Sequence, residues 1–126
     1  SSEGSLELKL SNTPKMLGYF RHLLEKRNEA NSGRKASNML VSFKLETKLE
    51  TEFLFKKAKE AIRKYGSDVV CSNILSTRYR EVWMVTPSAQ IHVTQDRPDV
   101  EIESDIVQFV NNLLQSTFNC TPKCRL

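Results

Sequence analysis

The stretch that decides the fold runs from Asn38 to Tyr65, NMLVSFKLETKLETEFLFKKAKEAIRKY. It begins with a short apolar run, Met39 to Val41, of the kind expected in a parallel strand that is covered on both faces. Thr47, with Glu50 three residues later, has the pattern of a capping box and predicts that a helix begins there. Gly66 is suited to end that helix in a left-handed conformation. A strand, a tight connection and a helix are therefore predicted.

The predicted helix has an apolar face and a basic face. The apolar side chains recur at helical spacing: Leu49, Phe53, Ala58, Ala61, Ile62 and Tyr65. The basic side chains fall largely on the other side: Lys56, Lys57, Lys59, Arg63 and Lys64. Residues Ser42 to Glu46 lie between the predicted strand and the helix. Since open α/β sheets bind ligands beyond the carboxyl ends of their strands, a site is expected there.

Other segments continue the alternation of strands and helices. We predict a half-buried strand at Leu6–Leu10, a helix that starts at Thr13-Pro14, a polar loop at Asn28–Ser37, strands at Asp68–Asn73 and Glu81–Thr86, a hairpin partner at Ala89–Thr94 turned by Pro87-Ser88, and a helix at Glu101–Phe118. This order predicts a three-layer α/β/α fold with a mostly parallel, Rossmann-like sheet, part of a larger doubly wound domain. Residues 1–126 are expected to form a single domain with a flexible tail at 119–126.

The composition is that of an ordinary soluble protein, with 39% apolar and 27% charged residues. No apolar run approaches the roughly 20 residues that span a bilayer, and no secretory signal pattern opens the chain, so a cytoplasmic protein is expected. The net charge of +4 is concentrated in the first half. A basic half suits nucleic acid, anionic small molecules or a solvated face. Because few aromatic residues lie among the lysines, nucleic acid is disfavoured.

The cysteines and histidines give no metal site. Cys71 lies in an apolar strand pattern and is read as a small buried hydrophobe. Cys120 and Cys124 are either half of a zinc site or two thiols in a mobile tail, and the second reading is favoured because no further Cys/His pair is near. His22 and His92 stand alone and are interpreted as surface or satisfied side chains.

Two predicted strands end in polar or aromatic side chains at the same edge of the sheet. Phe43 and Lys44 follow the first strand, Asn73 is the last residue of the second, and Arg78 follows it. Phe43 can stack on a flat ring, the Asn73 amide can donate to and accept from a base or sugar, and the two cations can meet phosphate or carboxylate. The alternative is structural: a core phenylalanine, a turn-forming asparagine and two solvated cations. No P-loop, G-x-G-x-x-G loop, nucleophile elbow or catalytic carboxylate pair is present.

Several segments in the right order carry a resemblance to a known family. They are SFKLET (42–47), KYGSDVVCSNILSTR (64–78) and EVWMVT (81–86), together with LELKLSNTPKML (6–17). The chain resembles the C-terminal half of phosphopantothenate–cysteine ligases of the eukaryotic type, a resemblance that covers most of residues 1–118.

The resemblance implies an enzyme of coenzyme A biosynthesis that joins 4′-phosphopantothenate to cysteine through an acyl-nucleotide intermediate. It implies ATP (or CTP) and Mg²⁺ as cofactors, a homodimer, and a requirement for the N-terminal half of the same enzyme, without which this chain is not expected to be competent. Phe43 and Asn73 match the nucleotide-contacting Phe and Asn of the family. Lys44 and Arg78 match basic positions, and their contact with phosphate or substrate is our hypothesis.

Two other classes of function compete with the ligase. One is a non-catalytic regulatory or interaction module that retains the fold. The other is a basic nucleic-acid binder, which would show salt-dependent binding to duplex.

Overall fold

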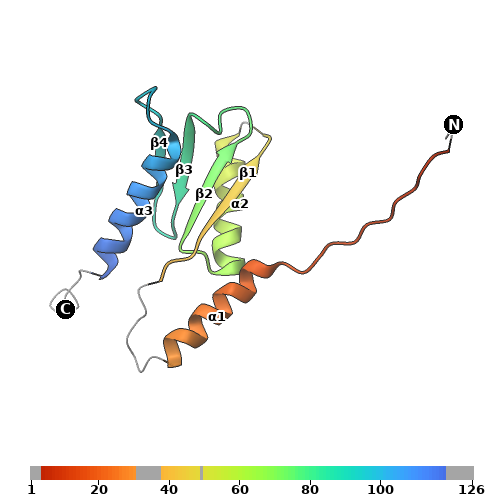
Figure 1. Ribbon diagram of the computed structural model, residues 1–126, viewed down its shortest axis with the longest axis horizontal. Helices are drawn as coiled ribbons and strands as arrows, with labels where there is room; N and C mark the ends of the chain where they lie inside the picture. The colour runs from red at the N-terminus through yellow and green to blue at the C-terminus, as the bar shows by residue number, and fades with distance from the viewer. Residues whose placement is uncertain (1–3, 31–37, 49, 119–126) are drawn as a thin grey trace.

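The computed structural model describes residues 4–30, 38–48 and 50–118 of the chain. Its elements, in chain order, are α1 (Met16–Ala30), β1 (Val41–Glu46), α2 (Thr51–Tyr65), β2 (Val69–Ile74), β3 (Glu81–Val85), β4 (Gln90–Thr94) and α3 (Ile102–Phe118). Figure 1 shows one sheet with α2 and α3 on its two sides, α1 at one end, and the N-terminal segment running away from the body.

The described strands form one mixed sheet in the order β1-β2-β3-β4. The strands β1 and β2 are parallel, whereas β2–β3 and β3–β4 are antiparallel. The α/β fold class is confirmed, but the expectation of a mostly parallel sheet is wrong. The reason is the short connections: a turn after Ile74 and the predicted Pro87-Ser88 turn, closed by Thr86 N–H donating to Ala89 O, each reverse the chain. Parallel pairing would need a crossover of a dozen or more residues, as α2 provides between β1 and β2.

Each face of the sheet packs against one helix, so the three predicted layers are confirmed. On one face the core consists of Leu54, Ala58, Val70, Ile74, Trp83 and Val85, with α2 supplying the helical members. On the other face it consists of Val69, Cys71, Val82, Met84 and Ile102, with α3 supplying the last. The strands β2 and β3 are buried on both faces because they lie in the middle of the sheet.

The central strand–helix unit exists, but its boundary differs from the prediction. Strand β1 continues through Ser42 to Glu46, residues that were expected to connect it to the helix. The helix begins after an N-cap at Glu50 that makes no side-chain cap bond, so the capping box predicted at Thr47 is wrong. The other end agrees with the sequence: Gly66 has φ 69° and ψ 28° and its N–H donates to Ile62 O at 2.9 Å.

The N-terminal segment departs most from the prediction. Residues 6–10 form no strand and are exposed, with Leu6 at 81% and Leu10 at 89% exposure. The helix α1 is present, but none of its residues is buried. It is attached to the body through Arg21, whose Nη1 donates to Asp68 Oδ2 at 3.2 Å, and the same carboxylate oxygen accepts from Leu40 N–H at 2.8 Å.

Two further predictions concern segments that the structure describes only in part. Helix α1 extends to Ala30 into the predicted loop, and residues 31–37 lie outside the described residues, as do Cys120 and Cys124 in the predicted tail.

Cys71 is fully buried as predicted, and burial raises the pKa of its thiol to about 11. Among the helices of the described ranges, none is long and apolar enough to cross a membrane.

Candidate functional site

Phe43 and Asn73 lie on adjacent strands and on the same face of the sheet. Phe43 pairs with Cys71 across the parallel β1–β2 ladder, and Asn73 pairs with Leu45. Because side chains alternate along a strand, all four project from one face, and Phe43 and Asn73 are offset by two residues, roughly 6.6 Å along the strand. This is the α3 face, since Cys71 packs in the cluster that includes Ile102.

The ring of Phe43 is open to solvent. The Phe43 side chain projects from the α3 face of the sheet at strand β1. Helix α3 itself contacts mainly β3 and β4, at the other edge of the sheet. Phe43 is therefore 68% exposed, and its neighbour Leu45 is 48% exposed. Phe43 is the third residue of β1, so the prediction that it follows the strand end is wrong, while Asn73 lies next to the end of β2. The structure thus brings the ring and the amide together, but along the strands rather than beyond them.

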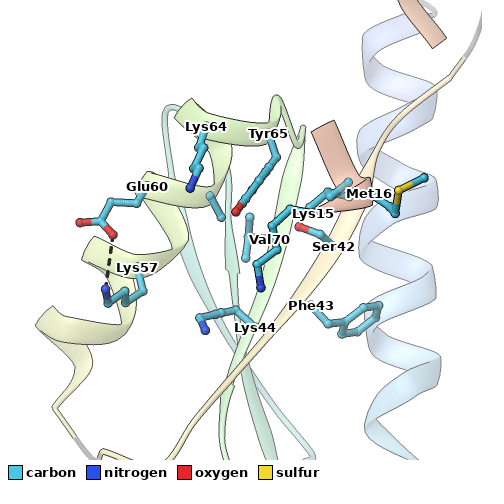
Figure 2. Close-up of a pocket in the computed structure, with 12 residues that line it drawn as sticks. Lys15, Met16, Ser42, Phe43, Lys44, Lys57, Glu60, Lys64, Tyr65 and Val70 are labelled. Atoms are coloured by element: carbon cyan, nitrogen blue, oxygen red, sulfur yellow. Dashed lines mark ion pairs between the residues drawn. The ribbon is translucent and has the colours of Figure 1, made fainter. Parts of the chain in front are cut away.

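Lys44 projects from the opposite face. Figure 2 shows the Phe43 ring on one side of β1 and the Lys44 side chain on the other, facing α2. The Lys44 Nζ lies 3.1 Å from Glu46 Oε1, two residues along the same strand. Lys44 is consequently not beside Asn73, and the expectation that these side chains share one crevice is wrong for Lys44.

Arg78 lies in the turn that follows β2, beyond the strand's carboxyl end as predicted. Its guanidinium donates to Leu75 O at 2.7 Å and to Tyr79 Oη at 2.9 Å. It also lies over the Tyr79 ring, 4.3 Å from the ring centroid. These contacts hold the side chain against its own turn, leaving part of the guanidinium able to meet an anion at that edge.

A cavity of about 390 Å³ opens between the start of α1, strand β1 and helix α2. Its lining combines basic and apolar side chains: Lys15, Met16, Leu17, Ser42, Phe43, Lys44, Lys57, Glu60, Ala61, Lys64, Tyr65 and Val70. Figure 2 shows Lys15, Lys44 and Lys64 directed toward the space between α2 and β1, with Lys57 beside them. Asn73 is absent from this lining.

Sequence reasoning missed this cavity. The available signal was the spacing of seven between Lys57 and Lys64, which places both side chains on one side of α2. The sequence assigned them only to a basic face, for which nucleic acid, anionic small molecules and solvent all stayed open. Lys15 is the residue just before α1, and nothing in the sequence pattern shows that its side chain approaches β1.

A second polar cluster lies on the β3–β4 hairpin. His92 Nε2 is 2.8 Å from Glu81 Oε2, and the imidazole stacks on Trp83 with centroids 4.5 Å apart and planes within 6°. Burial alone would raise the pKa of Glu81, but the neighbouring Thr77, His92 and Arg80 outweigh it and hold that pKa below its usual value. His92 is thus a satisfied side chain and His22 is exposed, as predicted.

The described residues contain no group of three His, Cys, Asp or Glu side chains arranged to hold a metal ion. The Ser72 hydroxyl, which faces α2 beside Lys44, is fully buried and has no hydrogen-bond partner within the described ranges.

No protein-family model matches the chain. It is, however, 31% identical over 111 residues to phosphopantothenate–cysteine ligase 1 of rice, which covers 88% of this chain and 31% of that protein. It is 29% identical over 121 residues to the coenzyme A biosynthesis bifunctional protein CoaBC of Methanocaldococcus jannaschii, covering 92% of this chain and 27% of that protein. The chain therefore spans less than a third of the length of these relatives.

A solved structure shows the same relationship in three dimensions. A Cab2 mutant in complex with phosphopantothenate-cysteine matches with a TM-score of 0.68 and 27% sequence identity, over 92% of this chain and 34% of that one. Sequence and structure thus agree over nearly all of this chain. The predicted resemblance to the phosphopantothenate–cysteine ligases is confirmed, and this chain is similar to about a third of such a protein.

Proposed function

We propose that the chain is part of an enzyme that joins 4′-phosphopantothenate to cysteine in coenzyme A biosynthesis. The observation that carries the proposal is the similarity over nearly the whole chain to ligases of that name and to a structure holding phosphopantothenate-cysteine. The nucleotide is ATP or CTP, with Mg²⁺ bound to its phosphates, and the enzyme works in the cytoplasm.

The exposed ring of Phe43 and the amide of Asn73 fit the nucleotide. An aromatic ring that is 68% exposed can stack on a base, and the amide on the neighbouring strand can donate to and accept from a base or sugar edge. These two groups bind and orient the nucleotide from the α3 face of β1. Arg78, at the carboxyl end of β2, is the cation placed to meet its phosphates, whereas Lys44 is directed to the opposite face.

The proposed reaction has two steps. The phosphopantothenate carboxylate attacks the α-phosphate of the nucleotide, and pyrophosphate leaves with the broken phosphoanhydride bond. The cysteine amine then attacks the resulting acyl-nucleotide to form the amide, and the nucleoside monophosphate leaves. This chemistry needs the reactants held in line and the phosphate charge offset, rather than a strong acid or base.

The complete enzyme requires more chain than the residues described here. Because this chain spans less than a third of its relatives, we propose that the N-terminal half of the same enzyme supplies the remainder of the nucleotide and substrate site. We further propose that the complete enzyme is a homodimer.

The site assignment is tested by amide hydrogen exchange in the complete enzyme with and without ATP. ATP should protect amides on both sides of Phe43 and Asn73, and Phe43→Ala or Asn73→Ala should each weaken nucleotide binding about tenfold, the loss of one stacking or hydrogen-bonding contact. Ile91→Ala, which shortens an exposed apolar side chain on β4, is the control and should leave affinity unchanged. Unchanged affinity in both site variants would contradict the assignment and favour a non-catalytic module with the same fold.

A further inference from the structure

Arg78 belongs to the turn that joins β2 to β3 (Figure 1). The turn is tied to the sheet, because Leu75 N–H donates to Glu46 O, at the end of β1, at 2.8 Å. A second backbone bond, from Arg80 N–H to Thr77 O at 2.8 Å, closes the turn on itself. The backbone that carries Arg78 is therefore set relative to the carboxyl ends of β1 and β2.

Tyr79 holds the guanidinium of Arg78 in two ways. Its phenolic oxygen accepts a hydrogen bond from Nη2 at 2.9 Å, and its ring centroid lies 4.3 Å from Cζ. On the other side, Nη1 donates to Leu75 O at 2.7 Å. An arginine side chain that is stacked and bonded in this way has already lost much of its rotamer freedom, so a ligand that binds it has less to order.

The guanidinium keeps both donors and charge for an anion. Of the five N–H donors of an arginine, two are used within the described residues, and the others remain for a ligand. None of the ion pairs in the described ranges involves Arg78, whereas Lys44 is paired with Glu46. Tyr79 is 65% exposed, so its ring is not part of the core. The contact between the two side chains therefore suits ligand binding better than core packing.

We propose that Tyr79 is a positioning residue, which holds the Arg78 guanidinium in place for the phosphates of the nucleotide. The inference rests on the proposed function, since it takes those phosphates as the anion. Tyr79 acts through Arg78 and makes no contact of its own with the ligand. Because the guanidinium is ordered before the nucleotide arrives, the loss of Tyr79 weakens nucleotide binding although the charge of Arg78 is still present.

The test compares variants of the complete enzyme by their KM and dissociation constant for ATP or CTP, whichever nucleotide binds more tightly. Tyr79→Phe keeps the ring and removes the hydrogen-bond acceptor, whereas Tyr79→Leu removes both. Affinity should fall about threefold in the first variant and about tenfold in the second. The KM for cysteine should stay unchanged. A purely structural role would lower the amount of active enzyme and leave the KM for the nucleotide as it was, which would overturn the inference.

A double-mutant cycle shows whether Tyr79 acts through Arg78. In the Arg78→Ala background, Tyr79→Phe and Tyr79→Leu should have no further effect on nucleotide affinity, because the group that Tyr79 holds is gone. Equal losses with and without Arg78 would mean that Tyr79 contacts the ligand itself, and would overturn the inference. Tyr19→Phe is the matched control: it removes a phenolic hydroxyl from the exposed side of α1 and should leave affinity unchanged.

The outcome is separate from that of the Phe43–Asn73 surface. Coupling between Tyr79 and Arg78, with Phe43→Ala and Asn73→Ala both silent, would contradict the nucleotide assignment of that surface and support this inference. Weakened binding in those two variants without coupling between Tyr79 and Arg78 would do the reverse. Because a dissociation constant needs no turnover, the coupling is measured even in an enzyme that shows no ligase activity.

Discussion

Phe43 and Lys44 are neighbours in the chain, yet their side chains project from opposite faces of the sheet. Because side chains alternate along a strand, the run SFKLET places the ring on the α3 face and the ammonium group on the α2 face. Reading the run as a loop would have placed both beside Asn73. The residue pair that the structure keeps together is Phe43 with Asn73, because their strands are parallel partners.

Glu81 illustrates how a single side chain can be tied to its neighbours by charge. It lies 2.8 Å from His92, and its side chain is 24% exposed, so the contact is partly shielded from water. The pKa of Glu81 is lowered in the folded chain. A carboxyl with a lowered folded-state pKa contributes stability above its unfolded-state value, and this contribution is lost as pH falls through the folded value.

We predict that Glu81→Gln lowers the free energy of unfolding near neutral pH and that the difference from the parent chain shrinks as pH falls through the lowered pKa of Glu81, where the carboxyl itself becomes neutral. Urea unfolding of the variant and of the parent chain at several pH values measures this difference. Glu7→Gln removes the same charge from the exposed N-terminal segment and should change little at any pH. A difference that stays constant with pH would show that the Glu81 charge plays no part.

Helix α2 shows which local signals survive folding and which do not. Its C-terminal signal, Gly66, acts as the sequence predicts because only a residue without Cβ adopts φ 69° readily. Its N-terminal signal at Thr47 is overridden, since β1 pairs with β2 as far as Glu46 opposite Ile74, and Leu75 N–H then donates to Glu46 O at 2.8 Å. Pairing with a distant strand decided where the helix could begin.

We predict that Gly66→Ala destabilises the fold by about 1 kcal/mol or more, because alanine is strained at positive φ. Its Cβ would also lie 2.9 Å from Arg21 Cγ, pressing on the side chain that joins α1 to Asp68. Urea unfolding measures the change. Gly18→Ala in α1 is the matched control: its Cβ would meet Tyr65 Cδ1 at an ordinary 3.7 Å, so it should be neutral or slightly stabilising. Equal effects at both glycines would contradict the left-handed cap.

The prediction of a strand at Leu6–Leu10 is wrong for a different reason. Alternating apolar residues show that a segment can be amphipathic as a strand, but a strand also needs a hydrogen-bonding neighbour. The described strands supply none to this segment. The buried runs of β2 and β3 were predicted well because their apolar character is set by two covered faces at once.

At the level of the assembled fold, the sequence predicted the three layers and the Phe43–Asn73 pair, because both follow from one parallel strand–helix–strand unit. It predicted neither the mixed sheet nor the lysine-lined cavity. The direction of β3 and β4 depends on short turns, and the cavity depends on how the start of α1 packs beside α2 and β1. Contacts between elements far apart in the chain leave little trace in local periodicity.

The measurement that tests the central claim most directly is steady-state pyrophosphate release by the complete enzyme containing these residues. We predict release that requires nucleotide, 4′-phosphopantothenate and cysteine together, and that falls at least about tenfold in Asn73→Ala, as expected for loss of a positioning contact, but not in Lys56→Ala. Release that continues without phosphopantothenate, or that is absent with all three substrates present, would contradict the account.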